Sequence, residues 1–235
     1  MKIRVIDYET TGMPEDGAKV CEVGFTDLII SDTGEMQVSP GRAILCNPGI
    51  HMPPEAQAVH HISDNDLIGA PPPDQVLPWV FDKSDADYFA AHNADFEAHF
   101  YPAPKPWICT YKVALRVWPD MPKHSNQYLR YAIPLTIPNQ EIGMPPHRAF
   151  PDTYVTAYLL AAEILSGKAT VEDMARWSTG PALLPRVPFG KHYGAKWEDV
   201  PTDYLQWVIE KGDFDRDVMA NARHHLRLRA TPGPG

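Results

Sequence analysis

The sequence predicts an α/β fold, because strand-like segments dominate residues 1–50 and helix-like segments dominate the remainder of the chain. With 235 residues the chain can bury a full hydrophobic core, either as one domain or as a domain with a small appendage. The 25 prolines gather in short connectors between the helical segments. These connectors are expected to be loops, and none is long enough to form a disordered linker.

The first strand is expected at residues 3–8, which are apolar and rich in β-branched side chains up to Asp7 and are followed by a Thr-Thr-Gly break ending at Gly12. Strand-like composition recurs at residues 20–30, at residues 43–46 and, for a shorter strand, at residues 87–91. The first three candidates follow one another closely and are separated by turn signals. They therefore predict an antiparallel meander at the start of the domain.

Helical segments are expected after the meander. They cover residues 54–60, 63–68, 76–81, 94–101, 108–118 and 126–131. The strongest pattern lies in residues 151–165, where apolar side chains recur every three or four residues and form one stripe. This long helix should anchor a first domain over residues 1–178. The composition changes after Gly167, and a small accessory module is expected over residues 181–235, with helices at 204–211 and 215–228.

Charge and cysteine content narrow the functional classes. The formal charge of −9 argues against a protein that holds nucleic acid mainly through a basic surface, unless bound cations offset clustered carboxylates. The three cysteines are scattered and include no C-x-x-C pair, so neither a disulfide framework nor a thiolate zinc site is expected. With no signal-peptide core and no apolar run of membrane-spanning length, we expect a cytoplasmic protein that does not engage a membrane.

Two carboxylates end the first strand. Asp7 and Glu9 are two residues apart, and the period of a strand directs both side chains to the same face. Two adjacent carboxylates repel each other unless a cation lies between them, which suggests a metal site. The alternative is that Asp7 only forms the following turn, as aspartate often does at strand ends.

A second set of polar residues precedes the long helix. His147 lies five positions before Asp152, and Pro151 suits the first helical turn. Asp152 could simply complement the helix dipole, but that role does not account for His147. A neutral imidazole near a metal-activated water can accept its proton, so His147 is a candidate general base.

A third candidate region is residues 90–100. Asn93 is expected to cap a helix whose Phe96 and Phe100 face the core. Asp95 and Glu97 flank Phe96 by about one hundred degrees on either side, so only one of them is expected to reach a shared site. Periodicity does not choose between them.

These three regions resemble the three exonuclease motifs of the DEDDh family. They read Asp7-Tyr8-Glu9-Thr10-Thr11-Gly12, His92-Asn93-Ala94-Asp95-Phe96-Glu97 and His147 followed by Asp152. The exonuclease X branch is the nearest likeness, on residues 107–112, 125–126, 147–149 and 189–191. The resemblance covers nearly the whole chain. It implies an RNase H-like fold, a mixed sheet flanked by helices, and a 3′→5′ exonuclease.

Carried over by position, the resemblance implies that two Mg²⁺ ions, or Mn²⁺ in their place, are bound by four carboxylates: Asp7, Glu9, Glu97 and Asp152. His147 would be the general base, and the residues touching the terminal nucleotide would be Thr10, Thr11 and Asn93. The family's second motif carries Asp where this chain has Glu97, a departure of one methylene, and Asp95 falls on the motif's variable position. The longer side chain should still serve as a ligand, although it leaves the preference between Mg²⁺ and Mn²⁺ open.

The resemblance implies a partner that is DNA with a 3′ end, single- or double-stranded, from which mononucleotides are released. Two alternatives remain: an exoribonuclease that trims RNA 3′ ends, and an inactive nucleic-acid-binding module of the same fold. In the accessory module, residues 189–194 either offer Lys191 and aromatic faces to nucleic acid or form a turn packed on the nuclease domain. The basic end of the last helix could likewise contact phosphate or only complement the helix dipole.

Overall fold

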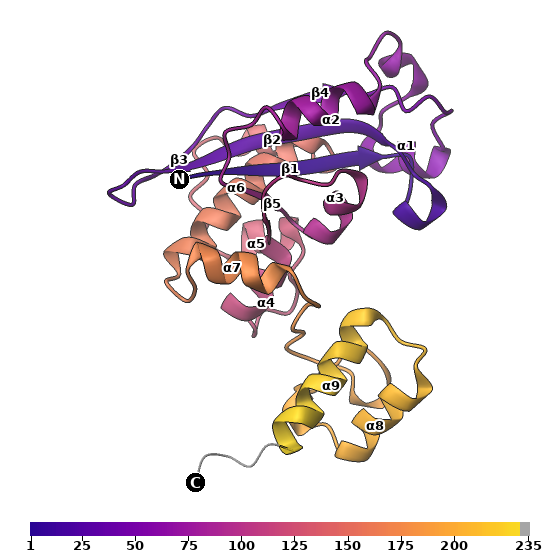
Figure 1. Ribbon diagram of the computed structural model, residues 1–235, viewed down its shortest axis with the longest axis vertical. Coiled ribbons are helices and arrows are strands. Elements are labelled where there is room, and N and C mark those ends of the chain that lie inside the picture. The colour runs from indigo at the N-terminus through magenta and orange to yellow at the C-terminus, as the bar shows by residue number, and fades with distance from the viewer. Residues whose placement is uncertain (231–235) are drawn as a thin grey trace.

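The computed structural model describes residues 1–230, whose strands form one mixed sheet (Figure 1). The strands are β1 (Lys2–Thr10), β2 (Val20–Ile30), β3 (Met36–Val38), β4 (Arg42–Leu45), β5 (Tyr88–Ala91) and β6 (Trp107–Cys109). Their order is β3-β2-β1-β5-β6, with β4 also paired to β2. β2 runs antiparallel to β1, β3 and β4, whereas β5 is parallel to β1 and β6 is parallel to β5. The predicted α/β fold with a mixed sheet is confirmed.

Most helices lie in the expected sequence regions. They are α1 (Pro54–His60), α2 (Pro73–Phe81), α3 (Ala94–Phe100), α4 (Thr110–Val117), α5 (Asn126–Ala132), α6 (Ala149–Leu165), α7 (Val171–Ser178), α8 (Thr202–Lys211) and α9 (Arg216–Ala230). Short 3₁₀ turns occur at Pro14–Asp16, Asp64–Leu67, Gln140–Gly143, Gly190–His192 and Trp197–Asp199. No helix within residues 1–230 is long and apolar enough to cross a membrane.

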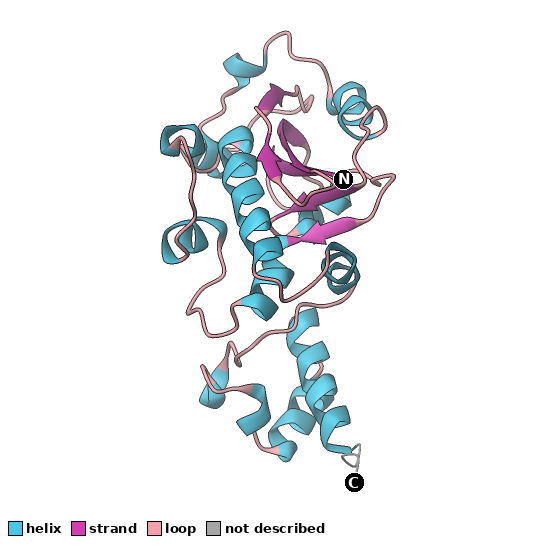
Figure 2. Ribbon diagram, turned by 90° about the vertical axis from the view of Figure 1, so that its left-hand side faces the viewer, coloured by secondary structure: helices cyan, strands magenta, loops and turns pink. Residues whose placement is uncertain are grey.

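The two faces of β1 pack against different helices. Ile3 and Val5 join one hydrophobic cluster with α4, α6 and α7, whereas Ile6 and Tyr8 join a second cluster with α2. Figure 2 shows the longest helix lying along one side of the sheet. Because alternate residues of a strand share a face, Asp7 continues the row of Ile3 and Val5 and faces α6. The sheet thus directs the odd-numbered carboxylates of β1 toward that helix.

A glycine permits α6 to begin close to the sheet. Gly24 lies opposite Asp7 in the β1–β2 register, and a Cβ added there would come within 2.3 Å of the backbone carbonyl carbon of Ala149. No side chain fits in that space, so only glycine allows the first turn of α6 to approach β2 beside Asp7. One turn further on, the hydroxyls of Thr26 and Thr153 are 2.9 Å apart and join the same two elements.

The expected antiparallel meander is confirmed in β1, β2 and β4. The unexpected strand β3 pairs with β2 on the same edge as β4, because the eleven residues of β2 are long enough to pair with both short strands. Two other local features differ from the expectation. The segment expected as one helix from 108 to 118 begins as β6 and becomes helical at Thr110, and a three-residue apolar run does not distinguish the two states. Helix α7 was not expected, although Thr170 and Asp173 form a capping box at its start.

The chain after α7 forms a separate body with its own hydrophobic cluster, seen at the bottom of Figure 1. Val187, Trp197, Leu205 and Val208 lie at its centre and are at most 2% exposed. This separate core supports our proposal of a domain boundary near residue 180, between an N-terminal domain (1–178) and a C-terminal module (181–235). Of the expected alternatives for residues 189–194, the chain takes a 3₁₀ turn beside a single bridge between Arg186 and Lys196.

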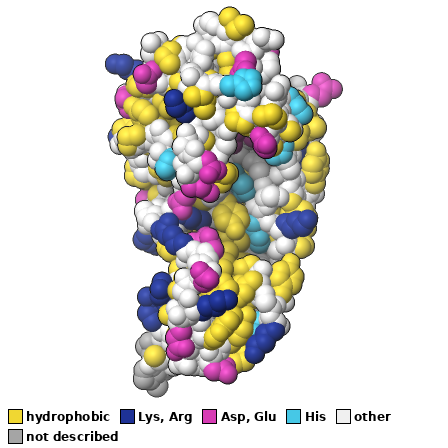
Figure 3. Space-filling model, turned by 90° about the vertical axis from the view of Figure 1, so that its right-hand side faces the viewer, with side chains coloured by type: hydrophobic (Ala, Val, Ile, Leu, Met, Phe, Trp, Pro, Cys, Tyr) yellow, Lys and Arg dark blue, Asp and Glu magenta, His cyan; other side chains and the backbone are white. Residues whose placement is uncertain are grey.

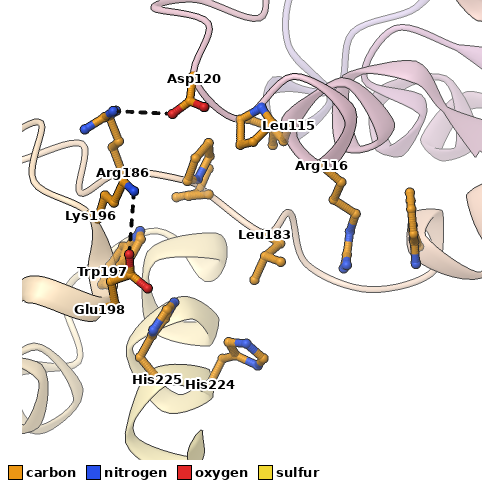
Figure 4. A pocket seen from close by; sticks show the side chains of 14 residues that line it. Leu115, Arg116, Asp120, Leu183, Arg186, Lys196, Trp197, Glu198, His224 and His225 are labelled. Carbon is orange, nitrogen blue, oxygen red and sulfur yellow. Dashed lines mark ion pairs between the residues drawn. The ribbon is translucent and has the colours of Figure 1, made fainter. Parts of the chain in front are cut away.

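A cavity lies between the module and helices α4 and α7 of the N-terminal domain (Figure 4). At this cavity Arg186 of the module forms an ion pair with Asp120 of the N-terminal domain at 3.7 Å, and His224 and His225 project from α9. Since both partners of the ion pair are well exposed, the pair contributes little to holding the two parts together. A further ion pair between the two parts joins Arg216, at the start of α9, to Asp95 at 3.6 Å.

Candidate active site

Three carboxylates meet where β1 ends and α6 begins. Asp7 and Glu9 come from β1 and Asp152 from the first turn of α6, and each offers an oxygen within 4.8 Å of the others. Figure 3 views the molecule from the side at which β1 ends, and acidic and histidine side chains gather there around a hollow. A third carboxylate from a distant part of the chain thus joins the Asp7–Glu9 pair, which supports the interpretation of the pair as part of a metal site.

Asp152 is held in place by two hydrogen bonds. Gln127 Nε2 donates to its Oδ1 at 2.9 Å, and the backbone N–H of His147 donates to its Oδ2 at 2.7 Å. The second bond links the loop before α6 to the first turn of α6. Asp152 therefore also serves the start of this helix, the alternative role considered from the sequence. Each carboxylate oxygen can accept more than one bond, so capping leaves room for a cation on the side that faces Asp7.

Glu97 approaches the same region from α3. Its side chain is buried, with 4% of the residue exposed, and its Oε2 finds no hydrogen-bond partner within residues 1–230. Asp95 is half-exposed and accepts two bonds from Lys112 Nζ at 2.8 and 2.9 Å. A buried carboxylate oxygen without a partner is costly unless a cation or a proton compensates for it. The geometry therefore supports Glu97 rather than Asp95 as the acid of the second motif.

The ionisation of this group of acids is strongly perturbed. Burial, followed by repulsion from Asp152, raises the pKa of Asp7 well above its usual range. Burial likewise raises the pKa values of Glu9 and Glu97 to about 8. Four mutually repelling, desolvated carboxylates are unfavourable by themselves, and divalent cations are the usual remedy. Oxygen-only ligand sets of this kind suit Mg²⁺ and Mn²⁺.

His147 lies at the rim of the cluster. Its side chain is exposed, and its φ angle of +60° is in the left-handed region, which histidine seldom occupies. Such strain persists only where the surroundings fix it, and here the hydrogen bond from its N–H to Asp152 does so. An exposed imidazole beside Asp152 can exchange a proton with solvent or with a bound water.

Two of the three predicted substrate-binding residues make local side-chain hydrogen bonds. Thr10 Oγ1 donates to the carbonyl of Gly12 at 2.7 Å, and Thr11 Oγ1 accepts from the N–H of Lys19 at 3.0 Å. Asn93 stands at the N-cap position of α3, but its φ is +89° and its side chain makes no capping bond. The expected capping bond of Asn93 is therefore wrong, because the left-handed backbone turns its side chain away from the helix.

Two supporting residues were not expected from the sequence. Glu22, paired with Glu9 across β1 and β2, accepts two bonds from Arg148 and one from the N–H of Ala149. The pair fixes the chain between His147 and α6. A charged residue in an otherwise apolar strand segment was the available signal for Glu22. Gln127 carried no comparable signal, because its role depends on the packing of α5 against α6.

Comparison with known families gives a consistent result. The exonuclease family model matches residues 5–160. Exodeoxyribonuclease 10 of Escherichia coli strain K12 is 31% identical over 229 residues, which is 95% of this chain and 98% of that protein. The 3′-5′ exonuclease DinG of Staphylococcus aureus strain USA300 is 28% identical over 166 residues, 66% of this chain but 17% of that protein.

Solved structures give the same picture. Exonuclease X in complex with 5′ overhanging duplex DNA superposes with a TM-score of 0.62 and 29% identity, over 75% of this chain and 99% of that one. The nuclease domain of 3′hExo, a DEDDh family member bound to rAMP, matches with a TM-score of 0.54 and 18% identity, over 71% and 92%. The second likeness concerns the fold alone. The RNase H-like architecture expected from the motifs is confirmed.

Proposed function

The chain belongs to the DEDDh exonuclease family, whose members are nucleases, and on this premise we propose that it is a divalent-metal-dependent 3′→5′ exonuclease that releases nucleoside monophosphates from DNA. The observation that carries the proposal is the convergence of Asp7, Glu9 and Asp152 within 4.8 Å, with the unpartnered oxygen of Glu97 nearby. A protein of this fold that lacked these acids could still bind nucleic acid but could not hydrolyse it.

The four acids suit a pair of divalent ions. Asp7 lies close enough to the other three acids for each of them to raise its pKa, so it would be a central ligand of the ions. Asp152 is oriented by Gln127 and by the loop of His147, and Glu97 supplies the buried oxygen that lacks a partner. When bound, the ions would promote attack by water and stabilise the departing 3′ oxygen.

We assign the general-base role to His147. Its exposed imidazole lies beside Asp152 at the open rim, where it can accept the proton of the attacking water and pass it to solvent. The backbone bond from His147 to Asp152 couples the position of the base to that of a metal ligand. Arg148, the next residue, donates two hydrogen bonds to Glu22, which helps to hold this segment in place.

Two comparisons favour DNA as the substrate. The relative that this chain matches over 98% of its length is named an exodeoxyribonuclease, and the 29% identical structure contains duplex DNA. Direction from the 3′ end is favoured by the name of the second relative. An RNA-trimming activity is the same-class alternative. An inactive binding module is disfavoured by the complete set of four acids and His147.

Digestion of end-labelled substrates tests the proposal. DNA and RNA of one sequence, labelled at either the 3′ or the 5′ end, are incubated with Mg²⁺, with Mn²⁺ and with a chelator. The proposal expects 5′-labelled DNA to shorten stepwise and 3′-labelled DNA to release labelled mononucleotide at once, only with metal. Shortening of RNA alone would favour the exoribonuclease, and no cleavage with either metal would favour the inactive module.

A further inference from the structure

The C-terminal module carries a group of aromatic rings and lysines on its surface, which we call the aromatic–lysine patch. Its members are Lys191, Tyr204, Trp207, Lys211 and Phe214. They come from the 3₁₀ turn that includes Lys191, from α8 and from the loop before α9. The patch lies outside residues 5–160, which the family model covers.

The rings of the patch are arranged side by side. The Tyr204 and Trp207 centroids are 5.2 Å apart with 30° between the ring planes, and Phe214 lies 5.6 Å from Trp207. The ammonium of Lys191 is 5.2 Å from the Tyr204 ring, and that of Lys211 is 5.4 Å from the Trp207 ring. The arrangement combines flat faces with cations, as single-strand binding surfaces do.

Close approach of the turn to Tyr204 requires a glycine. Gly190 has a φ of +64°, and a Cβ added there would lie 2.6 Å from the Tyr204 hydroxyl oxygen. The turn therefore presents Lys191 directly beside the Tyr204 ring, and a shallow pocket lined by Gly190, Lys191, Asp203, Tyr204 and Trp207 forms there. Residues 189–194, which the sequence marked as a possible contact for nucleic acid, thus supply part of the aromatic–lysine patch.

One ring of the patch lies outside the module's core. Trp207 is 44% exposed, whereas Tyr204 and Phe214 are partly buried and pack against the core formed by Trp197, Leu205 and Val208. Isolated exposed aromatic residues are common, but several gathered on one surface with lysines above them mark an interaction site. The chemistry of the patch identifies the ligand as a molecule with flat aromatic groups and negative charges.

Charge is distributed unevenly along the chain. Residues 181–235 hold eight of the 21 Lys and Arg but only seven of the 30 Asp and Glu. The nuclease domain is therefore strongly acidic, and the module is nearly neutral with a small positive excess. A polyanion is repelled by most of the nuclease domain outside its metal site, so the module is the more favourable place to hold it. Asp203 within the patch reduces the electrostatic gain, which leaves stacking as the main source of affinity.

The patch begins close to the catalytic edge. Arg216, two residues after Phe214, contacts Asp95, which lies two residues before Glu97. Figure 3 shows hydrophobic side chains with Lys and Arg among them on the lower part of the face whose upper part carries the acidic hollow. One extended strand can therefore lie across both regions.

We propose that the aromatic–lysine patch binds the single-stranded part of the substrate strand, several nucleotides to the 5′ side of the bond that is cut. Bases stack on Trp207 and Tyr204, and Lys191 and Lys211 lie near the phosphates. This inference rests on the proposed function, and it assigns the module the task of retaining the strand between successive cleavages.

Substrate length tests the inference. The full chain and its Trp207→Ala variant are compared on a dinucleotide, which reaches only the acidic site, and on a single-stranded DNA of roughly 20 nucleotides, which also spans the patch. Trp79→Ala is the matched control, because Trp79 is 46% exposed but lies on α2. The double variant with Lys191→Ala and Lys211→Ala tests the two ammonium groups separately from the aromatic rings.

The inference expects Trp207→Ala to raise the KM for the long strand about 5- to 100-fold, the range for loss of one stacking platform, with the dinucleotide rate unchanged. Trp79→Ala should alter neither. Equal kinetics of Trp207→Ala and wild type on the long strand would overturn the inference while leaving the exonuclease intact, as would equal losses on both substrates. A wild-type protein that cleaves neither substrate would overturn the proposed function itself.

Discussion

Arg148 and Glu22 form a charged pair that joins the chain just before α6 to the beginning of β2. Arg148 Nη2 donates to Glu22 Oε1 at 2.5 Å and Nε donates to Oε2 at 3.1 Å, while the side chain of Glu22 is only 2% exposed. Glu22 is the strand partner of Glu9 and lies close enough to raise the pKa of Glu9, but both of its carboxylate oxygens accept hydrogen bonds from Arg148. Its charge serves to position His147 and Asp152 instead of binding metal.

Replacing Glu22 by Gln should weaken both stability and catalysis. The substitution removes the charge but keeps the size, so Arg148 loses its partner and the loop of His147 loosens. We expect a loss of about 1–3 kcal/mol in unfolding free energy and a roughly 10- to 100-fold lower kcat with little change in KM. Denaturant unfolding and steady-state digestion measure these quantities.

The control for Glu22→Gln is Arg176→Ala, which breaks an exposed pair with Asp173 on α7. Exposed pairs contribute little, so this variant should behave as wild type. A Glu22→Gln protein with unaltered kcat would show that the Arg148 pair does not position the site.

Substitutions of Glu97 and Asp95 are expected to have opposite effects on activity and stability. Glu97→Gln should lower activity on the order of a hundredfold or more, because it removes a ligand of ions that stabilise the transition state by several kcal/mol. Asp95→Asn should leave the chemistry nearly intact but destabilise the fold, because Lys112, which is 3% exposed, loses its carboxylate. Measuring kcat and thermal unfolding for both variants separates the two roles, and the reverse pattern would move the second-motif acid to Asp95.

Stability should depend on pH in a metal-sensitive manner. The pKa values of Glu9 and Glu97 are raised to about 8 by burial, so the folded protein retains protons that the unfolded chain releases near its ordinary carboxyl pKa. The stabilising contribution is complete below the unfolded pKa and is lost as pH rises through the folded pKa. In a chelator the melting temperature should therefore fall between about pH 5 and pH 8. Mg²⁺ should cancel much of this fall.

Glu163 provides the control for the pH experiment. It is fully buried on α6, its two carboxylate oxygens have no hydrogen-bond partner within residues 1–230, and burial raises its pKa well above the usual range. Glu163→Gln should reduce the pH dependence to the same extent with and without metal. Glu97→Gln should reduce it only without metal. A melting temperature independent of pH in the chelator would contradict the proposed desolvation of these acids.

The general-base assignment is tested at His147. His147→Gln should lower kcat about 10²- to 10⁴-fold, the usual contribution of a positioned base. The four acids are unchanged in this variant, so metal-dependent stabilisation should persist. A variant that keeps the wild-type kcat would show that the proton goes elsewhere.

Much of this architecture follows from short-range patterns. The alternation of Ile3, Val5, Asp7 and Glu9 predicted that both acids share a face, and the bounds of β2 and α1 agree with the expected segments. The pairing of Phe96 with Phe100 inside the core was also predicted correctly. These features depend on the strand and helix periods, which a sequence displays directly.

Other features depend on contacts between distant segments. Residues 107–109 form a strand only because β5 offers an edge, and Glu22 matters only because Arg148 folds back to it from 126 positions away. The choice between Asp95 and Glu97 likewise required the location of Lys112. Pairings of this kind leave no local period in the sequence, so sequence reasoning found the candidate acids but not the groups that orient them.

The most direct test of the central claim is to locate Mn²⁺ by anomalous diffraction in crystals of the wild-type protein and of Asp7→Ala. The account predicts two ions about 3.5–4 Å apart among Asp7, Glu9, Glu97 and Asp152 in the wild type. It predicts an empty site in Asp7→Ala, whose metal-free fold should be intact or more stable because repulsion is relieved. A wild-type map with no ion among these four carboxylates would contradict the account.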